Sequence, residues 1–224
     1  MRLLAFDCAT IRCSAAVWDE GTIRAHVASE TPHGATEVLV PMLDRVLAEA
    51  AIGLQDVDRL GVTVGPGHFT GLRAGLAVAR GLVLATGLPA VAITTLEAVA
   101  AATDPTARRN RAVVVAIDSK RAEPYLQIFD EALSPLSAPV AGEIDDFVAS
   151  HRLPSGILVA GDAGPRLAAA LRRAGHDLEL ARSDPQPDAA VVAALAATRA
   201  PVDGPLRPFY LHPPAVKLPA AAPS

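Results

Sequence analysis

Two aspartates stand at the ends of apolar runs that indicate β-strands: Asp7 follows LLAF and Asp118 follows VVVAI. A carboxylate at a strand end can orient a metal–nucleotide complex. The loop that follows then usually carries glycine, so that backbone N–H groups can approach phosphate. Residues 8–11 read CATI and contain no glycine, so their Cβ atoms would crowd a phosphate. Asp7 is therefore interpreted either as a vestigial nucleotide-site residue or as an aspartate that bonds its own turn.

The stretch GPGHFTGLR, residues 65–73, is the most unusual in the chain. A glycine loop that leads into a helix N-terminus can bind an anion. It is not a P-loop, because GK[ST] is absent. The alternative interpretation is a tight turn between a strand and a helix.

Other catalytic or metal-binding patterns are missing from the sequence. The six histidines form no HxxxH or HExxH pair, and there is no GxSxG motif. Cys8 and Cys13 are too few for a disulfide scaffold, so we expect small buried residues in a reducing, cytosolic protein. The sequence thus predicts no catalytic residue, no metal site and no cofactor.

Composition bounds the class of protein. The chain has 224 residues, of which 51% are hydrophobic and 20% charged, enough to bury a core. The net charge of −4 gives no general attraction for a nucleic-acid backbone. The most apolar stretch, residues 72–93, contains Arg73 and Arg80, which argues against a membrane span.

Apolar periodicity predicts three strands, a helix, a strand, a helix and a further strand, followed by a second round. The two rounds align without a gap, because Asp7 and Asp19 each recur 111 positions later, as Asp118 and Asp130. The alternative is a chance match in an apolar chain. The repeat predicts an α/β protein of two RNase H-like lobes, the architecture of actin-like ATPases and sugar kinases. We assign residues 1–103 to an N-terminal lobe, 104–212 to a C-terminal lobe and 213–224 to a disordered tail.

The predicted helix at residues 70–86 contains an uncommon stripe of small residues. Gly71, Gly75 and Ala79 lie four apart and so share one face, where another helix can approach closely. The approaching helix belongs either to the same domain or to another subunit. In the second case, a bulky side chain on the stripe would force the two helices apart.

The sequence GPGHFTGLRAGLAVARGL, residues 65–82, resembles the GPGSFTGLR-type signature of the TsaB family, also called YeaZ. His68 stands where that family usually has serine. The resemblance extends to LLAFDCAT at residues 3–10, and to residues 33–41 and 88–100.

The second lobe also resembles the family, with departures. AIDSKRAEPY, residues 116–125, is similar to the family's DAR-x-x-E-V-Y stretch, from which Ser119 and Lys120 depart. PFYLH, residues 208–212, resembles a P-x-Y-L-R ending, with His212 in place of arginine.

The resemblance, strong over residues 1–130, implies a pseudoenzyme subunit of the machinery that makes threonylcarbamoyladenosine in tRNA. TsaB is a degenerate relative of TsaD, which transfers a threonylcarbamoyl group to a tRNA adenosine beside the anticodon. TsaD carries a paired-histidine metal site that this chain lacks. The resemblance implies that two N-terminal helices, matched by residues 36–51 and 70–86, bind TsaD, that the ATPase TsaE joins the pair, and that tRNA is contacted only indirectly. It also implies a homodimer through the same surface when TsaD is absent. The implied interface residues are His33, Leu39, Leu43, Gly71, Leu72, Gly75, Leu76 and Ala79.

Two other functions stay open from the residues alone. A stand-alone actin-like ATPase or small-molecule kinase would bind Mg-ATP and lose it on Asp7→Ala. A metallopeptidase, an older label for relatives of this family, would need a metal-binding histidine pair, which the sequence does not contain.

Overall fold

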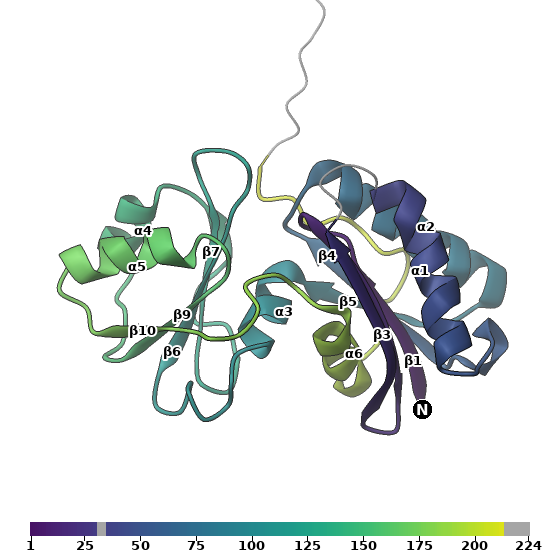
Figure 1. Ribbon diagram of the computed structural model, residues 1–224. Coiled ribbons are helices and arrows are strands. Elements are labelled where there is room, and N and C mark those ends of the chain that lie inside the picture. Colours follow the sequence, from purple (N-terminus) through teal and green to yellow (C-terminus); the bar gives the residue numbers. More distant parts are fainter. Residues whose placement is uncertain (31–34, 213–224) are drawn as a thin grey trace, which may run out of the picture.

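A computed structural model describes residues 1–30 and 35–212 of the chain, which form two lobes side by side (Figure 1). The first lobe contains β1 (Arg2–Asp7), β2 (Arg12–Asp19), β3 (Thr22–Glu30), α1 (Ala35–Glu49), a 3₁₀ turn (Leu54–Asp56), β4 (Arg59–Gly65), α2 (Phe69–Thr86), β5 (Ala90–Thr94) and α3 (Thr95–Ala101). The second round contains β6 (Ala112–Ile117), β7 (Tyr125–Phe129), β8 (Val140–Ala141), α4 (Ile144–Ser150), β9 (Ile157–Ala160), α5 (Gly164–Arg173), β10 (Leu178–Leu180) and α6 (Ala189–Thr198).

The two sheets share one topology. The first has the order β3-β2-β1-β4-β5, and the second, read from its other edge, has the order β8-β7-β6-β9-β10. In each, the first strand is antiparallel to the second and parallel to the fourth. Asp7 ends β1, and Asp118 directly follows β6. The predicted repeat and the predicted fold class, two RNase H-like lobes, are therefore confirmed.

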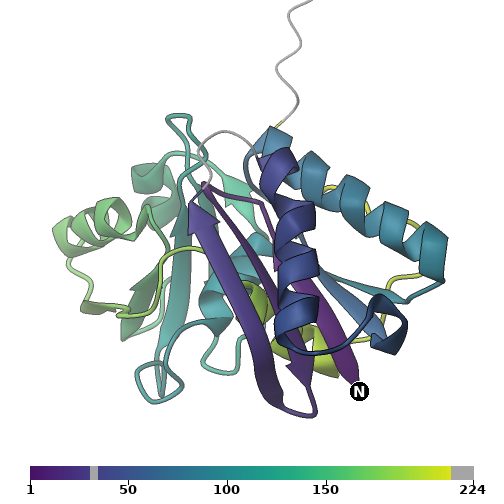
Figure 2. The same ribbon diagram turned by 45° about the vertical axis from the view of Figure 1, so that its right-hand side comes forward.

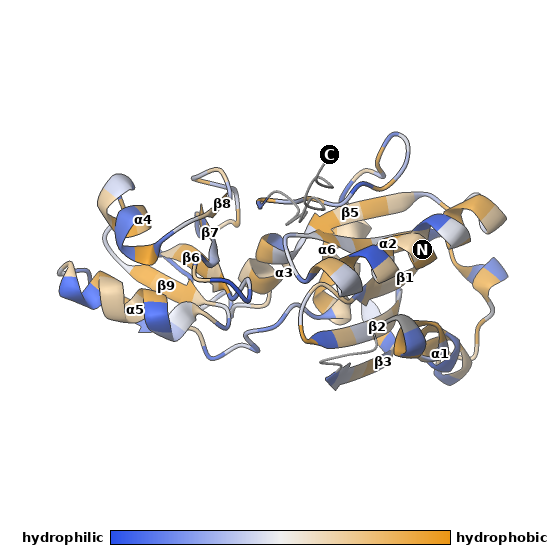
Figure 3. Ribbon diagram, turned by 90° about the horizontal axis from the view of Figure 1, so that it is seen from above, coloured by the Kyte–Doolittle hydropathy of each residue, from blue (hydrophilic) through white to orange (hydrophobic). Residues whose placement is uncertain are grey.

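The central strands are apolar on both faces because helices cover both sides of each sheet. Every residue of β6 is buried, as are the last five residues of β1. Figure 3, coloured by hydropathy, shows β5 and β9 as largely apolar. This is the pattern expected of parallel strands between two helical layers.

Helices α1 and α2 cover the outer face of the first sheet (Figures 1 and 2). Leu39 and Val46 of α1 and Leu76 of α2 join Leu4 and Phe6 of β1 in one buried cluster. The end of α2 is set by Gly87, whose φ of +73° is a left-handed cap that favours glycine. Among the helices of the described residues, α2 alone is long and apolar enough to cross a membrane, by length and composition only. Its inner side rests on the sheet.

The inner face of the first sheet is covered by α6, which arrives from the second round. Val192 and Ala196 of α6 are fully buried against Leu3 and Ala5 of β1. Gly61 of β4 allows this approach, because a Cβ there would lie 2.9 Å from the Ala196 Cβ. Helix α3 lies between the lobes, with Leu96 and Val99 packed in the cluster of the second sheet.

The predicted division at residue 103 is therefore wrong for the end of the chain. Residues 189–212 were assigned to the second lobe, yet α6 packs on the first sheet. Leu206 is buried in the first core, and the Phe209 N–H donates to the Val64 carbonyl at 2.7 Å. The sequence of a ten-residue apolar helix does not indicate which of two sheets the helix will cover. The tail at residues 213–224 lies outside the described residues.

Candidate functional site

Asp7 is completely buried at the end of β1. Its Oδ1 accepts hydrogen bonds from the Thr63 hydroxyl and from the Ala9 N–H, while Oδ2 has no partner among the described residues. Burial raises the pKa of Asp7 to about 7, against the opposing effect of the Thr63 and Ala9 hydrogen bonds. A substantial fraction of this carboxyl is thus neutral at pH 7, and it presents no charged oxygen to the surface.

The glycine stretch closes the loop that follows Asp7. The His68 N–H donates to the Ala9 carbonyl at 2.6 Å, and a Cβ on Gly67 would lie 2.1 Å from that same oxygen. The loop carbonyl is therefore covered by the chain's own backbone. Of the two interpretations of residues 65–73, the geometry supports a tight turn between β4 and α2.

Cys8 and Cys13 flank this loop and are joined by a disulfide. Both are buried, as predicted, but the expectation that they are reduced is wrong in this structure. The spacing alone could not reveal the bond, because it depends on β1 and β2 bringing their ends together. Asp7 and Ser14 are paired in the register of these strands, which places Cys8 and Cys13 at the same end of the hairpin.

The corresponding region of the second lobe is polar. Asp118 pairs with Lys120 at 2.9 Å and donates its N–H to Asp162. Lys120 has a φ of +60°, which is uncommon for a residue with a side chain. Burial, with a smaller effect of Lys120, lowers the pKa of His68 and favours its neutral form. No group of three or more possible metal ligands occurs within residues 1–30 and 35–212.

The other two departures from the family pattern are accommodated locally. The Ser119 hydroxyl donates to the Glu123 carbonyl and accepts the Arg121 N–H. The His212 ring lies 5.6 Å from that of Tyr125, and its Nδ1 lies 3.7 Å from Glu123.

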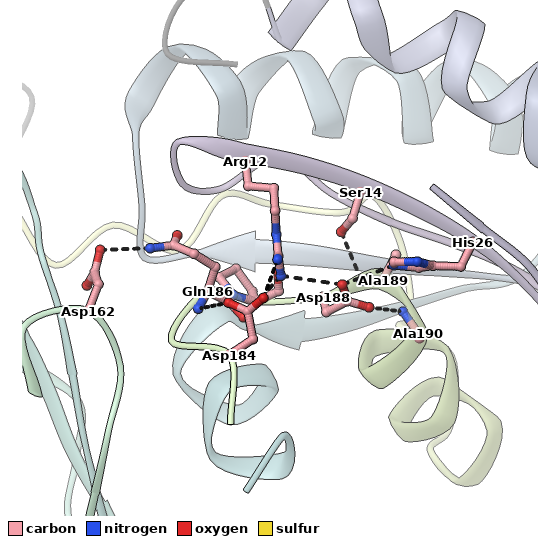
Figure 4. A network of polar contacts seen from close by, with 10 residues as sticks. Arg12, Ser14, His26, Asp162, Asp184, Gln186, Asp188, Ala189 and Ala190 are labelled. Carbon is pink, nitrogen blue, oxygen red and sulfur yellow. Dashed lines mark hydrogen bonds and ion pairs between the residues drawn. The ribbon is translucent and has the colours of Figure 1, made fainter. Parts of the chain in front are cut away.

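A polar network joins the two lobes through the segment that precedes α6 (Figure 4). Arg12 pairs with Asp184 and Asp188, and Gln186 donates to Asp162 at 3.0 Å in the second lobe. Asp188 also accepts from His26 at 3.0 Å. That hydrogen bond raises the pKa of His26, and it helps to lower the pKa of Asp188 despite burial. The network is a structural connection between lobes.

Most of the predicted interface residues are buried within the first lobe. This holds for Leu39, Leu43, Gly71, Leu72, Gly75, Leu76 and Ala79. Their role at a partner interface stays a prediction, and in this structure all seven residues pack inside the first lobe. The small-residue stripe faces the lobe itself, since a Cβ on Gly75 would lie 3.9 Å from the Cys8 Cβ. His33 lies outside the described residues.

The outer faces of the same two helices carry exposed apolar side chains. Leu84 is 89% exposed, Val40 48% and Phe69 47%. Within the part of the chain that the structure describes, these are three of the four most exposed large hydrophobic side chains, the other being Leu136 in the second lobe at 57%. We use the name outer helical face for the exposed sides of α1 and α2, which carry Val40 on α1 and Phe69, Ala77 and Leu84 on α2. This surface was not predicted from the sequence. A signal was present, because Ala77 and Leu84 lie seven residues apart and so share one side of α2 with Arg73 and Arg80.

The family model described as TsaD, tRNA N6-adenosine threonylcarbamoyltransferase, matches residues 28–175, more than half of the chain. The chain belongs to the TsaD family. Within this family, it is 39% identical over 127 residues to the tRNA threonylcarbamoyladenosine biosynthesis protein TsaB of Escherichia coli (strain K12). That alignment covers 56% of this chain and 53% of the relative, so the chain spans about half the length of the curated relatives it matches.

Solved structures agree with the resemblance to TsaB and with the fold. YeaZ from Pseudomonas aeruginosa superposes with a TM-score of 0.71 at 26% identity, covering 88% of this chain and 92% of that one. The resemblance to TsaB, also called YeaZ, is thus confirmed. The ethanolamine utilization protein EutJ from Carboxydothermus hydrogenoformans has a TM-score of 0.52 at 13% identity, covering 88% of this chain and 90% of that one. It shares the fold alone.

Proposed function

We propose that this chain is a non-catalytic subunit of the machinery that forms threonylcarbamoyladenosine in tRNA, and that it binds TsaD through the outer helical face. The name of the similar Escherichia coli protein supports the pathway. In this proposal TsaE joins the TsaD-bound form, tRNA is held indirectly, and the complex works in the cytoplasm.

The observation that carries the proposal is the apolar character of the outer helical face. Only six of the 18 residues of α2 are buried, although the helix is long and apolar. Exposed apolar patches on soluble proteins mark interaction sites. Two neighbouring helices offer ridges and grooves against which helices of a second protein can pack. In the absence of TsaD, a second copy of this chain would cover the same face.

The environment of Asp7 supports a non-catalytic role. Asp7 is buried, and its Oδ1 is held by Thr63 and Ala9. The carbonyl of Ala9 in the next loop is taken up by His68. Binding a nucleotide in the manner of actin-like enzymes would require this closed arrangement to open.

Calorimetric titration of TsaD from the same organism into matched variants tests the proposal. We expect Leu84→Asp to weaken binding by at least about tenfold, because a charge would be buried in an apolar contact. Leu136→Asp makes the same change at an exposed position of the second lobe and serves as the control. Gly75 is unsuitable, because a bulky side chain at this buried position would enter the packed interior of the lobe beside Cys8. Unchanged affinity for Leu84→Asp would exclude the outer helical face, and no binding of the unaltered chain would exclude the partner.

A further inference from the structure

Phe69 and Arg73, both exposed near the start of α2, and the half-buried Tyr210 form a group that we call the ring–arginine cluster. The Phe69 and Tyr210 rings are stacked with centroids 5.8 Å apart. The Arg73 Cζ lies 3.7 Å from the Phe69 ring centroid, and its Nε donates to the Tyr210 hydroxyl at 3.0 Å. The guanidinium plane is thus fixed by a ring and by a hydroxyl.

The outer edge of this guanidinium is unused in the described part of the chain. Of the other seventeen arginines, ten have no carboxylate partner there either, and seven pair with carboxylates, namely Arg2, Arg12, Arg24, Arg45, Arg111, Arg173 and Arg199. Arg73 has no carboxylate partner among the described residues, and its only hydrogen bond there uses Nε. The Nη1 and Nη2 groups therefore present a fork of parallel donors, the geometry that binds a carboxylate through both oxygens.

We propose that the ring–arginine cluster binds an acidic side chain of the protein that covers the outer helical face. This inference rests on the proposed function and adds a specificity-determining contact to it. Because Phe69 and Tyr210 already hold the guanidinium, less conformational entropy is lost when the carboxylate binds. Tyr210 is then a positioning residue, and Arg73 makes the contact.

Two observations favour a protein carboxylate over the phosphate of an RNA backbone. Arg73, Ala77 and Leu84 are exposed and spaced by four and seven residues, so the charge and the apolar contacts lie along one side of α2. The chain also carries a net charge of −4, which opposes general binding of nucleic acid.

Binding of TsaD to the full-length chain, measured at low and high salt, tests the inference. We expect Arg73→Gln to reduce affinity about 30-fold or more, because the partner's carboxylate would lose its charged partner, and to remove most of the salt dependence. Arg73→Lys keeps the charge and the salt dependence but binds more weakly than the unaltered chain, because an ammonium lacks the fork. Tyr210→Phe weakens binding by less than Arg73→Gln. Arg173→Gln, an exposed arginine of the second lobe, should leave affinity unchanged.

The outcomes separate this inference from the proposed function. Normal TsaD binding by Arg73→Gln, with Leu84→Asp impaired, would overturn the role of Arg73 and leave the outer helical face intact. Equal affinity of Arg73→Lys and the unaltered chain for TsaD would refute the claim that both Nη groups of Arg73 bind the carboxylate. Fluorescence anisotropy with bulk bacterial tRNA tests whether Arg73 binds RNA phosphate instead. Loss of tRNA binding by Arg73→Gln, with normal affinity for TsaD, would refute the proposal that the ligand is a protein carboxylate. Thermal melting checks each variant, and if Arg73→Gln is misfolded, Arg73→Lys and Tyr210→Phe decide.

Discussion

Arg12 of β2 donates from Nη2 to the carbonyl oxygen of Pro187 at 2.9 Å and pairs with the Asp188 carboxylate at 3.3 Å. A single side chain thereby fastens the segment that returns the chain from the second lobe to α6. Asp188 in turn caps α6 by accepting the Ala190 N–H at 2.8 Å. The position of α6 on the first sheet therefore depends on a contact between residues far apart in sequence.

Replacing Arg12 should loosen α6. The Arg12 side chain is only 14% exposed, so Arg12→Ala removes a largely buried ion pair with Asp188 and takes a donor from the carbonyl of the buried Pro187. We expect a loss of about 2 kcal/mol in the free energy of unfolding. Urea denaturation measures the loss, and hydrogen exchange should quicken in α6. Arg45→Ala, which breaks an exposed pair within α1, should cost less than about 0.5 kcal/mol. Equal effects of the two substitutions would refute the special role of Arg12.

Asp7 should make the protein less stable as pH rises. Its folded pKa of about 7 lies above the ordinary value of 3.8, so the folded state holds a proton that the unfolded state releases. The stability is fully present below the unfolded pKa and is lost as pH rises towards 7, by about 4 kcal/mol in total. Asp7→Asn cannot ionise and should flatten this part of the profile. Parallel pH profiles for both proteins would exclude Asp7 as the cause.

The Cys8–Cys13 disulfide can be tested by counting free thiols in the denatured protein before and after reduction. Protein purified and denatured without reductant should show no free thiol, and two after reduction. Closing so short a loop stabilises the fold by about 2 kcal/mol in the chain-entropy model, so reduction should lower the melting temperature. A double variant, Cys8→Ala with Cys13→Ala, should not respond to reductant. Two reactive thiols in unreduced protein would contradict the bond.

Two glycines near or in α2 should respond oppositely to alanine. A Cβ on Gly67 would lie 2.1 Å from the Ala9 carbonyl oxygen, so Gly67→Ala must displace the loop and destabilise the protein. Gly81 is exposed within α2 with open space around it, so Gly81→Ala should stabilise the helix by up to about 1 kcal/mol. Thermal unfolding compares the two. A neutral Gly67→Ala would argue against the tight packing of the β4–α2 turn.

The two lobes could be predicted from the sequence, but the contacts between them could not. Apolar runs ending in Asp7 and Asp118 located β1 and the end of β6, because buried strands leave a continuous signal. The sequence did not predict which sheet α6 covers, because its alanines and valines could pack on either sheet.

The candidate site was predicted only in outline. The helices were found, but a stripe of small residues such as Gly71 and Gly75 indicates close packing without saying which neighbour packs there. The ring–arginine cluster escaped notice because Arg73 and Tyr210 lie 137 residues apart and meet only through the C-terminal segment.

The central claim is that the outer helical face binds TsaD, and site-specific photo-crosslinking tests it most directly. A photoreactive amino acid at position 84, on the exposed side of α2, should crosslink to TsaD in high yield. The same group at position 136, on the second lobe, should not. A crosslink from position 136 alone, with none from position 84 under conditions where the two proteins bind, would contradict the account.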